Sequence, residues 1–216
     1  MEVFATREAI REYSDQLMGS GTPLGLVPTM GALHRGHLEL VRRALDENGR
    51  VVVSIFVNPT QFYNSEDLAS YPRDLEGDLN QLATLSPDLV VFAPRVDQMY
   101  QGAVAAERIE LDGLDQFMEG AHRKGHFQGV ATIVKRLLEA VGPTRAYFGE
   151  KDFQQLQIIR KLVETAGIPV QIVGCPIVRE PDGLALSSRN RRLTKRLRKE
   201  APFIHENLLK AKTWFG

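Results

Sequence analysis

Residues 24–45 have the sequence LGLVPTMGALHRGHLELVRRAL, in which a strand pattern passes through a glycine-containing turn into a helix pattern. Leu24 to Val27 is a short apolar run of the kind that forms a buried strand. Leu38, Val41 and Leu45 recur at intervals of three and four residues, which places them on one face of a helix. A strand that leads directly into a helix begins a βαβ unit, so this stretch predicts a parallel sheet.

The rest of the chain repeats this alternation. Apolar runs bounded by Gly, Pro or Asn predict strands at residues 51–57, 89–92, 146–148 and 170–173. Helical spacing occurs at residues 6–18, with Thr6 as the N-cap, and at residues 74–85, 129–141 and 152–166. This order predicts an α/β fold, a parallel sheet with helices on both faces. Because ligands bind such sheets at the carboxyl ends of the strands, the loops that follow the strands should carry the chemistry.

The composition narrows the class of protein. The 216 residues include 27 basic and 27 acidic side chains, and this balance argues against a dedicated nucleic-acid-binding protein. An apolar fraction of 43% is enough for a sizeable core. The single cysteine, Cys175, excludes an internal disulfide framework and is more consistent with a small buried residue than with a nucleophile. No apolar run is long enough to span a membrane and residues 1–8 lack a signal-peptide pattern, so we expect a cytoplasmic protein.

The C-terminal stretch has a different character. Seven of the eleven residues from Arg189 to Lys199 are Arg or Lys, and Thr194 could cap a helix that runs towards Trp214. The apolar residues of that helix would need a partner surface, and the chain stops at Gly216. We therefore expect a main domain at residues 1–184, followed at residues 185–216 by the hinge and first helix of a truncated second domain.

The loop at the start of the helix after residue 33 is the strongest candidate site. His34 and His37 are three residues apart at a helix N-terminus, where the backbone N–H groups and the helix dipole favour an anion. Neutral or charged imidazoles can donate hydrogen bonds to phosphate oxygens, and Gly36 lets a phosphate approach the backbone. Two alternatives stay open: the histidines only cap the helix, or they bind zinc with a third ligand such as His122 or His126.

Polar groups follow two other predicted strands. Asn58 and Gln61 come after residues 51–57 and offer neutral donors and acceptors for a hydroxylated substrate. Lys151 provides a point charge for a phosphate, Asp152 could cap the next helix or bind a ribose hydroxyl, and Gln155 lies one helical turn further on.

Two further segments could hold anions. Ser187, Ser188 and Arg189 combine two hydroxyl groups with a guanidinium, and residues 123–126 combine Arg123, Lys124 and His126 with a glycine. Cation-bearing loops at several strand ends are typical of phosphoryl chemistry on ATP, in which the protein positions groups and neutralises charge.

Six segments, in this order, resemble one family closely. Val27–His37 resembles the histidine motif of the HIGH-type nucleotidyltransferases, in the form found in the pantothenate synthetase (pantoate–β-alanine ligase) family. The other segments similar to that family are Phe56–Phe62, Tyr71–Asp74, Gly125–Val134, Phe148–Gln155 and Arg179–Asn190.

The resemblance implies a Rossmann-like domain and a smaller C-terminal lid domain. It also implies that ATP, with Mg²⁺, drives the condensation of pantoate with β-alanine to pantothenate, AMP and pyrophosphate through a pantoyl adenylate. The family forms homodimers, so the resemblance implies a dimer.

The resemblance also assigns roles to residues. The catalytic residues would be His34, His37, Lys151 and Arg189. Residues that bind ATP would be Pro28, Thr29, Met30, His34, Gly36, His37, Gly149, Lys151, Asp152, Val178, Ser187, Ser188 and Arg189, with Gly149 and Asp152 at the ribose and Val178 at the adenine. Pantoate would be bound by Met30, Gln61 and Gln155. Asn58, Arg123 and His126 would lie near the substrates. Mg²⁺ would be held chiefly by the phosphates, with help from Asp78 and Gln81. Family members can carry a second acidic residue where this chain has Gly77.

Two alternative functions are considered. A related nucleotidyltransferase would move AMP or CMP onto a phosphate or alcohol, but Gln61 and Gln155 argue against it, because a phosphorylated acceptor would require additional cations there. The second alternative is a truncated module that binds ATP and pantoate without efficient turnover.

Overall fold

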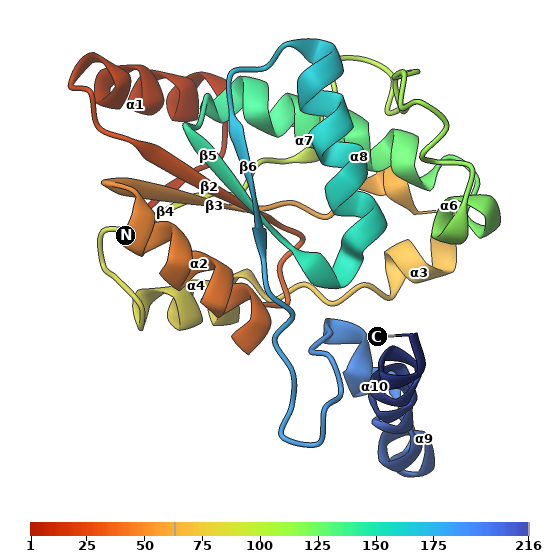
Figure 1. Cartoon of the computed structure of the whole chain (residues 1–216). Helices are drawn as coiled ribbons and strands as arrows, with labels where there is room; N and C mark the ends of the chain where they lie inside the picture. The colour runs from red at the N-terminus through yellow and green to blue at the C-terminus, as the bar shows by residue number, and fades with distance from the viewer. Residues whose placement is uncertain (63, 216) are drawn as a thin grey trace.

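A computed structural model describes residues 1–62 and 64–215 of the chain (Figure 1). Its centre is a parallel sheet with the strand order β1-β4-β3-β2-β5-β6. The strands are β1 (Glu2–Phe4), β2 (Leu24–Thr29), β3 (Arg50–Ile55), β4 (Val90–Phe92), β5 (Arg145–Gly149) and β6 (Gln171–Cys175). The predicted α/β fold is confirmed. The predicted strands are present within a few residues of their expected ends.

The strand order reverses at β2. From β2 the chain builds outward through β3 to β4, and it then returns to place β5 on the other side of β2. The loops after β2 and β5 therefore leave neighbouring strands at the carboxyl edge of the sheet and diverge to opposite faces. This divergence opens the crevice in which doubly wound sheets bind ligands.

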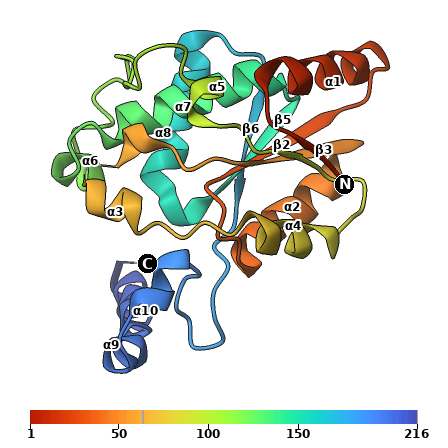
Figure 2. The same ribbon diagram turned by 180° about the vertical axis from the view of Figure 1, so that it is seen from behind.

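Helices cover both faces of the sheet, as Figures 1 and 2 show from opposite sides. One face carries α1, α7 and α8, and the other carries α2 and α4. Neighbouring strand residues alternate between these two cores: Val52 packs on the α7 side, whereas Val51 and Val53 pack on the α2 side. The helices are α1 (Arg7–Gly19), α2 (Arg35–Glu47), α3 (Ser65–Ala69), α4 (Leu75–Ala83), α5 (Val96–Met99), α6 (Met118–His122), α7 (His126–Val141), α8 (Phe153–Ala166), α9 (Lys195–Glu200) and α10 (Phe203–Phe215).

Side-chain caps mark the start of several helices. The hydroxyl of Thr6 accepts a hydrogen bond from the backbone N–H of Ala9, which confirms Thr6 as the N-cap of α1. Asp74 caps α4 in the same way through the N–H of Gly77. Asp152, which was expected either to cap α8 or to bind a ribose hydroxyl, occupies the N-cap position, but its side chain makes no capping hydrogen bond and pairs with Lys151 at 3.0 Å. Helix α7 begins at His126, three residues earlier than expected.

The C-terminal region differs from its prediction at one point. Thr194 does cap a helix, by accepting a hydrogen bond from the N–H of Leu197. That helix, α9, ends at Glu200, and α10 begins at Phe203. Pro202 lies at the break, where it has no N–H to continue the hydrogen-bond ladder of α9. Both helices lie beyond the carboxyl edge of the sheet, away from its two helical layers (Figure 1).

The sequence did not predict several short elements. They are β1, α3, α5, α6 and three 3₁₀ helices: η1 (Pro59–Gln61), η2 (Glu150–Asp152) and η3 (Ser188–Arg192). Within residues 1–62 and 64–215, none of the helices combines the length and the apolar character needed to cross a lipid bilayer.

Candidate active site

A cleft of about 240 Å³ opens at the switch point of the sheet. The loops after β2, β3, β5 and β6 line it, together with η3. Most of the predicted site residues lie on its wall: Pro28, Thr29, Met30, His34, Gly36, His37, Asn58, Gln61, Gly149, Lys151, Asp152, Gln155, Val178, Ser187, Ser188 and Arg189. Arg123, His126 and Asp78 are not on this wall.

The two histidines of the β2 loop cap α2 with one ring nitrogen each. Nδ1 of His34 accepts a hydrogen bond from the N–H of Gly36 at 3.1 Å, and Nδ1 of His37 accepts one from the N–H of His34 at 3.3 Å. The rings are stacked with their centroids 4.0 Å apart. Because each Nδ1 acts as an acceptor, the ring proton of each neutral histidine must be on Nε2. Capping and ligand binding are therefore compatible, since Nε2–H is left to donate.

The electrostatics keep both rings neutral. Burial lowers the pKa of His37 to about 3, and the nearby His34 and Lys151 contribute to this decrease. Burial also lowers the pKa of His34, with contributions from Lys151 and Arg191. At neutral pH these side chains are hydrogen-bond donors without charge, and Lys151 supplies the positive charge beside them.

Gly36 has a function that the sequence did not suggest. A Cβ atom at this position would lie 2.9 Å from Cε1 of the His34 ring. The glycine thus makes room for the imidazole that caps the helix, in addition to any space it leaves for a ligand.

Elsewhere on the wall of the cleft, a buried asparagine orients Gln61. Asn58 is 1% exposed, and its Nδ2 donates to Oε1 of Gln61 and to the carbonyl of Gly129, both at 3.1 Å. Its Oδ1 accepts hydrogen bonds from the hydroxyl groups of Thr60 and Tyr100. The amide nitrogen and oxygen of Asn58 thus both have hydrogen-bond partners within the protein, and one of these partners is Gln61. Asn58 therefore positions Gln61. The Nε2 of Gln61 is turned towards the Sδ atom of Met30, 3.0 Å away, on the cleft side.

His126 also supports Gln61. Its Nδ1 lies 2.7 Å from the carbonyl oxygen of Gln61, and its Nε2 lies 3.1 Å from the guanidinium of Arg123. An arginine can only donate, so Nε2 is the acceptor and Nδ1–H donates to Gln61. Burial lowers the pKa of His126, which agrees with a neutral ring. Arg123 also pairs with Glu119, so this segment braces the wall of the cleft.

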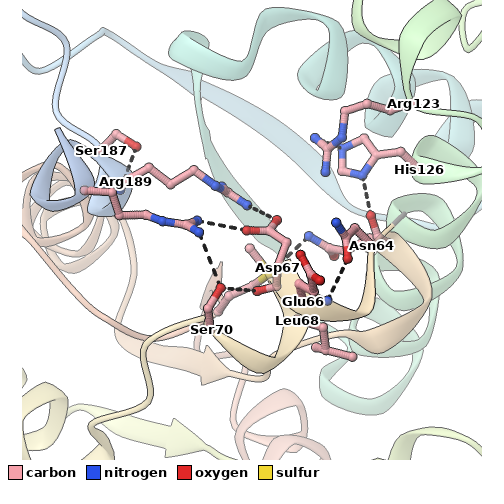
Figure 3. A network of polar contacts seen from close by, with 12 residues as sticks. Asn64, Glu66, Asp67, Leu68, Ser70, Arg123, His126, Ser187 and Arg189 are labelled. Carbon is pink, nitrogen blue, oxygen red and sulfur yellow. Dashed lines mark hydrogen bonds and ion pairs between the residues drawn. The ribbon is translucent and has the colours of Figure 1, made fainter. Parts of the chain in front are cut away.

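The 3₁₀ helix η3 is tied to α3 by ion pairs (Figure 3). Arg189 and Arg192 of η3 bind the two carboxylate oxygens of Asp67 at 3.0 and 2.9 Å. Arg192 also donates to the hydroxyl of Ser70. The guanidinium of Arg189 lies over the ring of Tyr71, 5.8 Å from its centroid. Sequence reasoning missed Asp67 because its partners lie more than 120 residues further along the chain.

The side chains expected to help hold a metal make hydrogen bonds to the backbone of the β2 loop. Both carboxylate oxygens of Asp78 accept backbone N–H groups from the β2 loop, and Gln81 donates to the carbonyl of Leu33. In the described part of the chain, no three His, Cys, Asp or Glu side chains are grouped to bind a metal ion, so the zinc alternative has no geometric support. Cys175 is buried, and burial raises the pKa of its thiol, as expected for a structural residue.

The sequence is similar to those of known proteins over nearly its whole length. The family model described as pantoate-beta-alanine ligase matches residues 2–215. The pantothenate synthetase of Christiangramia forsetii is 52% identical over the whole of this chain, which covers 76% of that relative. The chain belongs to the pantoate-beta-alanine ligase family.

Solved structures of pantoate-beta-alanine ligases have the same fold. The pantothenate synthetase of Thermus thermophilus is 50% identical with a TM-score of 0.86, and the match covers 97% of this chain and 74% of that one. The Francisella tularensis ligase, solved in complex with β,γ-ATP and β-alanine, is 40% identical with a TM-score of 0.88. That match covers 95% of this chain and 78% of the Francisella chain.

Proposed function

We propose that this chain ligates pantoate to β-alanine with ATP, through a pantoyl adenylate, and releases pyrophosphate and AMP. The observation that carries the proposal is that one cleft holds both kinds of group. Neutral Nε2–H donors of His34 and His37 line it together with Lys151, and so do the amide side chains of Gln61 and Gln155. Membership of the ligase family and the nucleotide and amino-acid complex of the Francisella relative support it.

In the first half-reaction, a carboxylate oxygen of pantoate attacks the α-phosphorus of ATP. The bond from that phosphorus to the bridging oxygen breaks, and pyrophosphate leaves. The carboxylate is already ionised and needs no general base. The chain therefore contributes alignment of the reactants and donors for the phosphate oxygens, from His34, His37, Lys151 and Arg189.

In the second half-reaction, the unprotonated amine of β-alanine attacks the acyl carbon of the adenylate. The bond between that carbon and the AMP oxygen breaks, and the new amide nitrogen loses a proton. No covalent enzyme intermediate is formed, which agrees with the buried, unactivated Cys175.

The binding roles follow the walls of the cleft. For ATP the proposed contacts are Pro28, Thr29, Met30, Gly36, Ser187 and Ser188 near the phosphates, Gly149 and Asp152 at the ribose, and Val178 at the adenine. For pantoate they are Met30, Gln61 and Gln155, with Asn58 and His126 acting through Gln61. Mg²⁺ would be bound by the phosphates, because both carboxylate oxygens of Asp78 are engaged by the backbone.

We further propose the larger organisation that the family resemblance implies. Residues 1–184 would form the nucleotide- and pantoate-binding domain, and residues 185–216 the hinge and first helix of a lid. The enzyme would act as a cytoplasmic homodimer. Sedimentation equilibrium of the purified chain tests the dimer, and a monomer at tens of micromolar would contradict it.

The experiment that tests the function is pantoate-dependent exchange of labelled pyrophosphate into ATP, with Mg²⁺ and without β-alanine. Exchange that requires pantoate is the expected result. Absence of exchange, while calorimetry still detects ATP binding, would contradict turnover by this chain. Absence of both would contradict the assignment of the cleft.

A further inference from the structure

The loop between β2 and α2 has an unfavourable backbone conformation. Gly31 and Ala32 both have positive φ angles, +74° and +49°. Two consecutive left-handed residues reverse the chain sharply enough to bring His34 to the start of α2. Ala32 has a Cβ atom, and its left-handed conformation costs on the order of 1 kcal/mol, so contacts from outside the loop must hold it.

A single carboxylate provides those contacts. Asp78, on the first turn of α4, is 2% exposed and lies 46 residues along the chain from Ala32. Its Oδ2 accepts the N–H of Ala32 at 3.0 Å, and its Oδ1 accepts the N–H of Leu33 at 2.7 Å. The carboxylate also packs against Gly31, where a Cβ atom would lie 2.8 Å from Oδ2. On the other side of the loop, the hydroxyl of Thr29 accepts the N–H of Gly31 at 3.2 Å.

We infer that Asp78 is a positioning residue, which holds the Gly31–Ala32 turn so that the Nε2 atoms of His34 and His37 face the nucleotide. It does this in place of binding the metal directly. The inference rests on the proposed function, since it names the group that arranges the donors of the adenylation step.

A carboxylate suits this position better than an amide. Two N–H groups point at its two oxygens, and an ionised aspartate can accept with both. Asparagine has the same shape but one oxygen, so its NH₂ group would face a backbone N–H. Asp78→Asn therefore removes one hydrogen bond and places the NH₂ donor of asparagine against a backbone N–H donor, without opening a cavity. Asp74→Asn is the matched control: Asp74 is an exposed N-cap on the same helix, and asparagine caps equally well.

Three measurements on the full chain test the inference. They are the kcat and KM of pantoate-dependent pyrophosphate exchange, the Mg²⁺ concentration that gives half-maximal exchange, and the ¹⁵N amide shifts of Ala32 and Leu33 without ligands. For Asp78→Asn we expect at least a tenfold loss of kcat, half-saturation by Mg²⁺ within twofold of the parent value, and displaced amide shifts at both residues. Asp74→Asn should match the parent chain in all three measurements.

A second variant approaches the same contact from the loop. Gly31→Ala places a Cβ atom against Asp78 and strains a left-handed position, so it should lower kcat in the same way. In the double variant Gly31→Ala/Asp78→Asn, the fold loss of kcat should be far smaller than the product of the losses in the two single variants. If Asp78→Asn does not fold, as judged by circular dichroism, the kcat and the amide shifts of Gly31→Ala test the inference.

The results of these measurements distinguish the positioning role of Asp78 from the proposed function of the chain. A large increase in the Mg²⁺ requirement of Asp78→Asn, with the rate restored by excess Mg²⁺, would assign Asp78 to the metal and overturn the inference. Parental kcat in Asp78→Asn would also overturn it. If the parent chain itself shows no exchange, the proposed function fails, whereas unchanged amide shifts at Ala32 and Leu33 would reject the positioning role without any substrate.

Discussion

Nη2 of Arg189 lies 3.0 Å from Oδ2 of Asp67, so an arginine on the wall of the cleft is held by a carboxylate from a different segment (Figure 3). The pair connects η3 with α3, and Arg192 shares the same carboxylate. A phosphate of ATP would have to compete with Asp67 for Arg189. With the proposed role of Arg189, this contact would link nucleotide binding to the position of η3.

Asp67→Asn should strengthen ATP binding, because Arg189 no longer has to leave a carboxylate. Both side chains are partly exposed, and such pairs contribute about 0.2–1 kcal/mol. The expected change in Kd is therefore a decrease of about 1.4-fold to fivefold by calorimetry. Asp97→Asn, which breaks an exposed pair with Arg95, is the control and should leave the Kd unchanged. Weaker ATP binding by Asp67→Asn would show that Asp67 helps Arg189 to reach the nucleotide.

The two ring nitrogens of His37 can be tested separately. The Oδ1 of asparagine can replace Nδ1 as acceptor for the N–H of His34, but asparagine is too short to replace Nε2–H. His37→Asn should keep the free energy of unfolding within about 1 kcal/mol of the parent and lower the exchange rate by about 10²-fold or more. His37→Gln, which can present a donor near Nε2, should retain more activity, and His37→Ala should lose both the cap and adenylation. A His37→Asn variant with parental exchange would remove His37 from the proposed mechanism.

Acid should destabilise the protein through His37. The folded pKa of about 3 lies below the unfolded value near 6.5, so the unfolded chain binds the additional proton. The contribution of neutral His37 is complete above pH 6.5 and is lost as the pH falls towards 3. Over this range the free energy of unfolding should decrease by up to about 1.4 kcal/mol per pH unit for this residue. In urea titrations from about pH 7 to about pH 4, His37→Asn should show a shallower decrease than the parent chain.

The network around Asn58 should affect pantoate more than ATP. In Asn58→Asp, an acceptor replaces the Nδ2 donor and faces Oε1 of Gln61 and the carbonyl of Gly129. We expect a loss of about 2–3 kcal/mol of stability and at least a tenfold increase in the KM for pantoate, with a small change in the KM for ATP. Asn207→Asp, at an exposed amide of α10, is the control substitution. Equal increases in both KM values would indicate general disorder of the site in place of the proposed orientation of Gln61.

The sequence predicted the fold well because its signals are local. A run such as Val51–Val57 is apolar with β-branched residues over one strand length, and Leu38, Val41 and Leu45 repeat at the helical period. The elements that escaped prediction are short: β1 has three residues, and α5 has four. Such segments contain too few residues to show the hydrophobic periodicity of a helix or a strand. The break at Pro202 is the exception, since a proline visible in the sequence ends the helical pattern that was expected to continue through it.

For the site, the sequence by itself determined which chemical groups follow each strand, and the carboxyl ends of parallel strands meet at one edge of the sheet. It therefore predicted that His34, Lys151 and Gln61 lie near one another, and all three line the cleft. Only the tertiary structure decided what each group can do. The tautomers of His34 and His37, the use of both oxygens of Asp78 by the backbone, and the hold of Asp67 on Arg189 depend on hydrogen-bond partners and burial. Two of these partnerships join residues 45 to 122 positions apart, and sequence spacing cannot reveal them because they form only where the folded chain returns to the same place.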